Sequence, residues 1–223
     1  MELNTYPLVC TRGVVLYPNQ EIVIDVGRDN SVHAVENAQD NYDKKICLFS
    51  QKELEQENPA TEDIYSVGTL CEIRHIRRFD NFLRVKFRGI KRVKLNKWIN
   101  GSLSDLVEVE ILESEKQDTV EEEALIRMIA DELDRMQGQD RFVTKEIVME
   151  ISKGMGGEFL SDKAVQGLPL DLERKQKYLE TLGVNDRLMM LLQDMAKEKK
   201  MSEVEKQINE TVKERIDQGQ KDY

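Results

Sequence analysis

The sequence predicts an α+β fold in which a β-rich N-terminal part is followed by a helical bundle that ends in a long helix. The hydrophobic period changes near residue 117. Before this point, apolar segments are short, alternating and rich in β-branched residues, which is typical of strands. After it, apolar residues recur every three or four positions, which is typical of helices. We expect a β-rich domain at 1–117, a helical bundle at 118–184 and a long helix at 185–223.

The N-terminal stretch PLVCTRGVVLYPNQEIVIDV, residues 7–26, predicts two strands. A buried helix of this length would not contain Gly13, Pro18 and so many β-branched residues. We expect the two strands to span 13–17 and 21–26.

The second of these strands places one apolar residue on its outer face. Side chains alternate along a strand, so Ile22, Ile24 and Val26 point to one side. Val23 and Asp25 point to the other side. Val23 is therefore either an isolated surface residue or part of a contact surface, and the sequence leaves both open.

One helix interrupts the strands of the N-terminal part. In GRDNSVHAVENAQD, residues 27–40, valine and alanine recur at helical spacing. Either Asp29 or Asn30 can supply the N-cap. The remaining predicted strands span 46–49, 67–76, 82–88, 91–99 and 106–112.

A hairpin is predicted around the stretch FDNFLRVKFRG. Asp80 and Asn81 tolerate the backbone angles of a tight turn, and apolar and basic residues alternate along the strand that follows. Phe79 and Phe82 flank the turn. A fully solvated tip would not need two aromatic rings.

Basic residues are concentrated between residues 74 and 97, which contain ten Lys or Arg and one acid, Asp80. Alternating cations with aromatic rings nearby could bind nucleic-acid phosphates and stack on bases. The alternative is a solvated outer face whose charges meet the acidic helical part. We favour this alternative, because the formal net charge of the chain is −10. The candidate nucleic-acid contacts are Arg74, Arg77, Arg78, Arg84, Lys86 and Arg88.

The second half of the chain predicts four helices. Asp118 and Glu121 fit a capping box at the start of the first helix, which ends before Gly138. The glycine-rich segment 154–157 is interpreted as a mobile turn. Further helices are expected at about 141–152, from the cap Asp171 to Gly183, and from Asn185 to about 217. The apolar side of the first helix is expected to consist of Val120, Ala124, Ile126, Ile129, Leu133 and Met136.

The last of these helices is too long to be covered by a small bundle. At 1.5 Å per residue it would extend for roughly 50 Å. From Ala196 onward a narrow apolar stripe interrupts a charged surface, which suggests contact with a partner. A solvated or frayed end is the alternative. The stripe consists of Met201, Val204, Ile208, Val212 and Ile216.

Known catalytic and cofactor-binding motifs are missing from the sequence. No Gly-Lys-Ser or Gly-Lys-Thr step of a phosphate-binding loop occurs. His33 and His75 lie outside any GxSxG or HExxH motif. We therefore predict no catalytic residue, no metal site and no cofactor for this chain.

Cysteine content and hydropathy favour a soluble cytoplasmic protein. Cys10, Cys47 and Cys71 are widely spaced without a CxxC pair, so we expect small buried residues in a reducing compartment. No apolar run approaches the roughly 18 residues that a membrane span needs, and the N-terminus does not resemble a signal peptide.

Five segments resemble, in order, the N-terminal region of Lon, the ATP-dependent protease. The first four are PL with RGVVLYP (7–18), DVGR with AVENA (25–38), DIYSVGTLCEI (63–73) and RGIKRVK (88–94). The fifth, LPLDLERKQKYLETLGVNDRLMMLL, is similar to the helical segment of that family, and the charged run to Tyr223 resembles the long helix that leads to its ATPase. The chain departs from the family at Asn19, where glycine is usual, and at Asn81, where Asp-Gly is usual.

The resemblance implies a PUA-like β-rich domain followed by a helical bundle. In Lon this region recruits unfolded, damaged or regulatory proteins and helps the homo-hexamer to assemble. The ATPase module, with its ATP and Mg²⁺, and the Ser-Lys peptidase module would follow Tyr223 in a full-length parent. We therefore expect this chain to bind substrates and other Lon protomers, and not to cleave them.

A domain that recognises unfolded chains needs exposed apolar groups, because its ligands display side chains that folded proteins hide. Val23, Phe79 and Phe82 are the candidate substrate contacts. The helical half could instead cover them. Two other classes of function also stay open: a nucleic-acid-binding module that uses the basic hairpin at 74–97, and a structural assembly domain.

Overall fold

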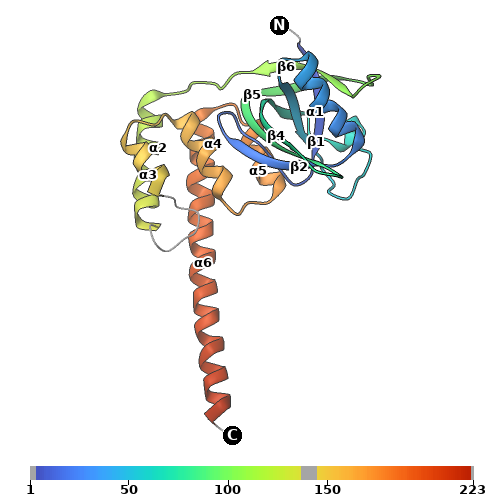
Figure 1. Cartoon of the computed structure of the whole chain (residues 1–223). Helices are drawn as coiled ribbons and strands as arrows, with labels where there is room; N and C mark the ends of the chain where they lie inside the picture. Colours follow the sequence, from blue (N-terminus) through green and yellow to red (C-terminus); the bar gives the residue numbers. More distant parts are fainter. Residues whose placement is uncertain (1–3, 137–144, 222–223) are drawn as a thin grey trace.

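A six-stranded sheet makes up the N-terminal part of the structure (Figure 1). The structure is a computed structural model that describes residues 4–136 and 145–221. Helix α1 (Asp29–Asn41) and a short 3-10 helix, η1 (Thr61–Asp63), accompany the sheet. The strands are β1 (Asn4–Thr11), β2 (Glu21–Val26), β3 (Lys45–Ser50), β4 (Val67–Arg78), β5 (Leu83–Ile99) and β6 (Leu106–Leu112).

Five of these strands close into a barrel. The strand order is β2-β5-β4-β3-β1-β6, and β6 pairs with β5 as well as with β1. The second pairing closes a ring of β1, β3, β4, β5 and β6, which leaves few strand edges unpaired. Within the described residues, β2 lies outside this ring and pairs with β5 alone.

Strand β3 is buried on both of its faces. Cys47 and Phe49 pack with apolar side chains of the other ring strands, whereas Ile46 and Leu48 pack with α1. This position explains the continuous apolar run at 46–49, because a half-exposed strand would alternate apolar and polar residues.

Strand β5 is continuous where the sequence predicts two strands. The predicted strands at 82–88 and 91–99 are joined through Gly89. A Cβ atom at Gly89 would lie 2.1 Å from the carbonyl oxygen of Tyr17. Glycine therefore marks the point at which the chain before β2 crosses β5, and not the end of a strand.

The prediction of a strand at 13–17 is wrong. These residues form no strand, and the first strand is β1, which the sequence did not reveal. Val15 and Tyr17 belong to a core cluster that they share with the helices, and the Tyr17 hydroxyl donates a hydrogen bond to the Lys175 carbonyl at 2.8 Å. The segment is apolar on both sides because Val15 and Tyr17 pack on the helical part, whereas Leu16 packs in the core cluster of the β-rich part.

The other predicted elements of the β-rich part are confirmed within two residues of their ends, including helix α1. Its predicted cap is wrong. Arg28 occupies the N-cap position and no side chain caps the helix, so neither Asp29 nor Asn30 has the predicted role. Asn30 instead donates a hydrogen bond to Asp105 at 2.6 Å.

The helical part confirms the predicted bundle and long helix. Asp118 caps the first helix, since its Oδ1 accepts hydrogen bonds from the N–H groups of Val120 and Glu121 at 2.8 and 2.9 Å. The side chain of Asp171 accepts one from the Arg174 N–H, also as predicted. The helices are α2 (Thr119–Met136), α3 (Lys145–Ser152), α4 (Gly157–Gly167), α5 (Leu172–Glu180) and α6 (Val184–Lys221).

Helix α4 was not predicted. The glycines at 154–157 suggested only a turn, but Gly157 is the first residue of α4. A Cβ atom at Gly157 would lie 2.7 Å from Cδ1 of Leu188, so this glycine allows α4 to approach α6 closely. The beginning of the predicted helix at 141–152 lies outside the described residues, and α3 covers the rest.

The buried face of α2 was predicted only in part. Ile129, Leu133 and Met136 are buried as expected, but Leu125 is buried too and Val120 is 77% exposed. With 3.6 residues per turn, Leu125 shares a face with Ile129, whereas Val120 and the exposed Ala124 lie on the opposite side of the helix.

A buried ion pair joins the barrel to the helices. Arg92 of β5 donates two hydrogen bonds to the carboxylate of Asp162 in α4, one of them at 2.9 Å, and a third to the Leu179 carbonyl at 3.1 Å. Arg187 of α6 lies 3.8 Å from the same carboxylate. All three charged residues are almost completely buried. The barrel and the long helix are therefore tied to one point of α4.

Helix α6 extends far beyond the bundle (Figure 1). Its first turns contribute Leu188, Leu191 and Met195 to the core. The predicted stripe from Met201 to Ile216 lies on the free part of the helix, and its five apolar residues are between 42% and 55% exposed. Among the described residues, no helix has the length and apolar character that a membrane crossing requires.

The three cysteines are free thiols. Cys47 and Cys71 are buried, as predicted, and Cys10 is partly buried. Burial raises the pKa of the Cys10 thiol to about 12. The thiol therefore stays protonated, and unreactive as a nucleophile, at neutral pH.

Candidate binding site

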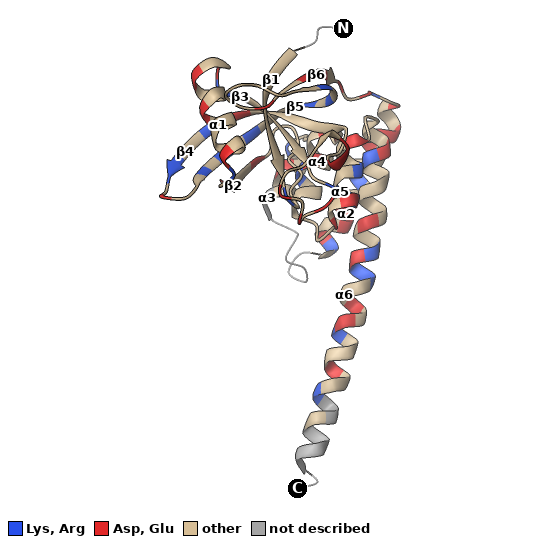
Figure 2. Cartoon of the chain, turned by 90° about the vertical axis from the view of Figure 1, so that its right-hand side faces the viewer, with Lys and Arg blue, Asp and Glu red and all other residues tan. Residues whose placement is uncertain are grey.

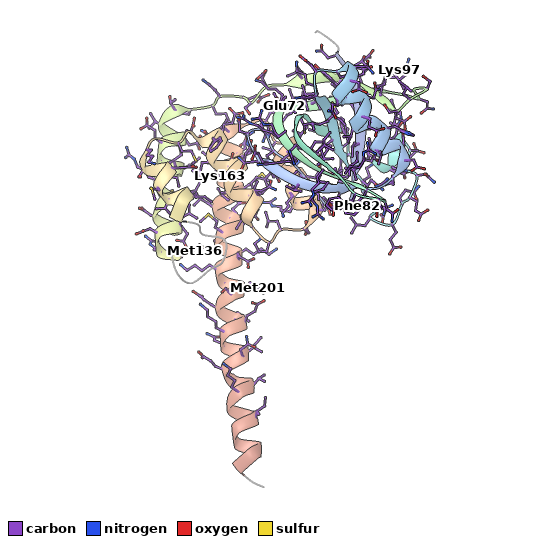
Figure 3. The ribbon with its side chains drawn as sticks, viewed as in Figure 1. Glu72, Phe82, Lys97, Met136, Lys163 and Met201 are labelled. Atoms are coloured by element: carbon purple, nitrogen blue, oxygen red, sulfur yellow. The ribbon has the colours of Figure 1, made fainter. Side chains whose placement is uncertain are left out.

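The hairpin formed by β4 and β5 is confirmed, and its tip carries a stacked aromatic pair. The Phe79 N–H donates a hydrogen bond to the Phe82 carbonyl at 2.9 Å, which closes the turn at Asp80 and Asn81. The two rings are 4.6 Å apart between centroids, with an angle of 12° between their planes. The hairpin lies on the side of the barrel that faces away from α6 (Figure 2). Figure 3 labels Phe82, one residue before β5, and Lys97, near the other end of that strand.

Two guanidinium groups cover part of the aromatic pair. Arg77 lies 5.1 Å from the centroid of the Phe79 ring, and Arg84 lies 5.3 and 5.6 Å from the Phe79 and Phe82 rings. These are cation–π distances. Phe79 and Phe82 are therefore half-buried, with only part of each ring open to a ligand.

Val23 lies on the outer face of the same sheet and is 55% exposed. Its neighbour across the strands is Lys86 of β5. Two residues further along β2, Asp25 accepts two hydrogen bonds of 2.7 Å from Arg84, the residue that covers both rings. Val23 and the aromatic pair thus belong to one surface, and the helical half does not cover Val23.

The basic residues of the hairpin are largely neutralised by acids of the β-rich part. This corrects the expectation that their charges would meet the acidic helical half. Of the ten basic residues at 74–97, Arg92 is the one with an ion pair to the helical half in the described residues. The pairs on the hairpin and its neighbours are Arg74 with Glu72, Arg78 with Glu36, Arg84 with Asp25, and Lys86 with Glu21.

These ion pairs also lower the pKa of two of the acids. The hydrogen bond from Lys86 lowers the pKa of Glu21, and the hydrogen bond from Arg84 lowers the pKa of Asp25. Both carboxylates therefore stay charged under mildly acidic conditions. Positive and negative charges therefore alternate on the outer face of β2, β5 and β4. Such a face attracts nucleic-acid phosphates less than the cluster of cations seen in the sequence would.

A second surface, between α2 and α6, was not predicted. A groove of about 710 Å³ is lined by Met128, Leu192 and Ala196 together with charged residues. Met128 is 57% exposed. No sequence pattern indicates this groove, because it depends on how α2 lies against α6. Within residues 4–136 and 145–221, no group of three or more His, Cys, Asp or Glu residues could hold a metal ion.

The barrel, the bundle and the projecting helix together define the class of protein. The fold is that of the N-terminal domains of Lon proteases. The N-terminal domain of Mycobacterium avium complex Lon protease matches with a TM-score of 0.70 and 19% identity, over 86% of this chain and 98% of that one. The Lon N-terminal domain protein of Xanthomonas campestris matches with a TM-score of 0.59 and 18% identity, over 85% and 97%.

The chain belongs to the family described as the ATP-dependent protease La (LON) substrate-binding domain, whose model matches residues 5–197. The Lon protease of Syntrophomonas wolfei is 34% identical over 226 residues, which include 100% of this chain. The Lon protease of Brevibacillus choshinensis is 31% identical over 218 residues, or 97% of the chain. The chain spans 28% of the length of both relatives. The family inferred from the sequence is confirmed.

Proposed function

We propose that this chain recruits unfolded, damaged or regulatory proteins to a Lon-type ATP-dependent protease. The observation that carries the proposal is the exposed Val23 beside the partly exposed Phe79–Phe82 pair, on a domain of the substrate-binding family. Apolar side chains on an otherwise charged face can contact apolar segments that folded proteins hide. The interaction is weak and tolerant of sequence, because only a few apolar groups take part.

The parent protein supplies the chemistry in this proposal. Its ATPase module binds ATP and Mg²⁺, and its Ser-Lys peptidase module cleaves the protein that this chain has bound. Several copies in a hexamer increase the effective concentration of the binding surface, so that weak sites together hold one substrate. We propose a cytoplasmic location for the assembly.

Val23 provides the most direct mutational test of this site. In Val23→Asp, we expect affinity for a permanently unfolded protein to fall by about fivefold, since a half-exposed valine contributes roughly 1 kcal/mol of apolar contact. Val120→Asp is the matched control, because Val120 is also an exposed valine but lies on α2. Fluorescence anisotropy measures both variants. Equal affinities for Val23→Asp, Val120→Asp and the unchanged chain would show that Val23 is not part of the binding site.

We also propose that the stripe on α6 supports assembly with other protomers. A row of apolar side chains on a free helix is typical of a helix that packs against another. In Ile208→Glu, we expect sedimentation velocity to show fewer oligomers at a given concentration, because a charge replaces an apolar contact. Gln207→Glu introduces the same charge next to the stripe and should have no effect. A similar loss in both variants would indicate a general charge effect and no contact through the stripe.

A further inference from the structure

Strand β2 has an open edge next to the proposed binding surface. Within the described part of the chain it pairs with β5 and with no other strand. A strand with one neighbour leaves every second set of backbone N–H and C=O groups without a partner strand. Such an edge can pair with an extended polypeptide from another molecule.

The register of the strands shows which groups face the open edge. The Gly89 N–H donates a hydrogen bond of 2.9 Å to the Gln20 carbonyl, one residue before β2. Residues 20 and 89 follow the register in which Glu21 is opposite Arg88. In an antiparallel pair the direction of the backbone groups alternates. The backbone groups of Ile22, Ile24 and Val26 therefore face β5, and those of Glu21, Val23 and Asp25 face the open edge.

Both acidic side chains of β2 on this outer face form ion pairs with β5. Glu21 pairs with Lys86 at 2.6 Å, and Asp25 pairs with Arg84 at 2.7 Å. Free charges on an edge strand commonly prevent pairing with other chains. Since both acids are held by cations of β5, Val23 stands exposed between two neutralised positions.

A cavity of about 380 Å³ lies beside the C-terminal half of β2. It separates β2 from the end of β1 and the residues that follow β1. Its volume lies within the range of roughly 300–1,000 Å³ that is usual for ligand sites. The lining includes the apolar residues Val9, Val14, Ile24 and Val26.

Two arginines that also line the cavity carry charge without an ion pair in the described residues. Arg12 donates a hydrogen bond to the Gln56 carbonyl. Arg28 donates to the Gln51 side chain and to the Cys10 and Glu57 carbonyls. Burial lowers the pKa of Arg28, and the nearby charge of Arg12 adds to the effect. Asp25 also lines the cavity, but it is paired with Arg84. The two arginines therefore leave the cavity complementary to an acidic side chain that lies next to apolar ones.

We propose that an unfolded polypeptide segment binds as an additional β-strand on the open edge of β2, with an apolar or acidic side chain in the cavity between β2 and the end of β1. Backbone hydrogen bonds to Glu21, Val23 and Asp25 are the same for every substrate sequence, which accounts for broad recognition. A folded protein does not bind, because its backbone groups are already paired. The inference rests on the proposed function and specifies how the same surface binds its substrate.

Backbone methylation of a peptide tests the inference without changing the protein. The probe is a fluorescent peptide with a core of alternating valine and serine, as long as the six residues of β2, followed by one aspartate. Two further versions carry N-methyl groups on the odd or on the even core residues. Methylation removes backbone donors and leaves every side chain in place, so we expect one version to bind the whole chain at least about tenfold more weakly and the other to bind nearly unchanged.

The outcomes separate this inference from the proposed function. If both methylated versions bind as tightly as the parent peptide, strand addition is overturned. The proposed function, which requires only contacts with apolar side chains, is then retained. If the parent peptide and an unfolded protein both fail to bind, the proposed function itself fails. Loss of binding for both methylated versions would also contradict pairing along one edge.

Two variants of Val23 test the inference from the protein side. Val23→Pro removes an N–H that faces away from β5, so the pairing of β2 with β5 is retained. Val23→Thr keeps this N–H and the β-branched shape. We expect Val23→Pro to abolish peptide binding and Val23→Thr to retain most of it, and the reverse order would overturn strand addition. If Val23→Pro does not fold, hydrogen exchange on the unchanged chain decides, since the Val23 and Asp25 amides must become protected when peptide binds.

Discussion

Replacing Asp162 by alanine is expected to lower the free energy of unfolding by about 3–5 kcal/mol, the usual cost of leaving a buried charge without its partner. Asp162 accepts hydrogen bonds from Arg92 and lies 3.8 Å from Arg187. Without the carboxylate, two buried guanidinium groups face each other. The variant therefore loses the attraction and gains a repulsion at the junction of barrel and helices.

Urea denaturation followed by circular dichroism measures this effect. Asp40→Ala is the control, because Asp40 is an exposed acid on α1 and its removal should change stability by less than about 0.5 kcal/mol. If Asp162→Ala and Asp40→Ala unfold at the same urea concentration, the ion pair contributes nothing to the junction.

Replacing Tyr17 by alanine is expected to lower the free energy of unfolding by about 3–5 kcal/mol, the range for removal of a large buried aromatic side chain. Tyr17 is fully buried and belongs to the core cluster of the helical part. Tyr17→Phe keeps the ring and removes the hydrogen bond to the Lys175 carbonyl, so it should lower stability by only about 1 kcal/mol.

The same denaturation experiment compares the two Tyr17 variants. If the free energy of unfolding falls no more in Tyr17→Ala than in Tyr17→Phe, the ring does not stabilise the contact between the barrel and the helices. We expect each variant to unfold in a single transition at a lower urea concentration than the unchanged chain, because Tyr17 belongs to a core shared by the barrel and the helices.

Tyr17 also shows where the sequence could not predict the fold. An apolar, β-branched run such as 13–17 is the usual sign of a buried strand. It can equally be a segment that packs on distant helices, and the choice depends on tertiary contacts. Helix α4 was missed for a related reason, since Gly157 serves close packing against α6 and not a turn.

Local patterns predicted the hairpin and the long helix. The Asp80–Asn81 turn and the alternation on the next strand depend on neighbouring residues, and the structure confirms both. The exposure of Val23 follows from the alternation of side chains along β2. Capping by Asp118 is likewise a local property.

Partners across the sheet could not be predicted from local patterns. The stacking of Phe79 on Phe82, and the positions of Arg77 and Arg84 over the rings, require the finished hairpin. The pairing of Arg84 with Asp25 requires the register of β2 on β5. The open edge of β2 is also a property of the whole sheet, because it depends on which strands pair.

Recognition of unfolded proteins is tested most directly by titrating the chain against a labelled, permanently unfolded protein, its folded counterpart and an RNA, each at low and moderate salt. The account predicts binding to the unfolded protein that changes little with salt, and no comparable binding to the folded protein or the RNA. Binding to RNA alone, with a steep loss of affinity as salt increases, would contradict the account and move the site to the basic residues between Arg74 and Lys97.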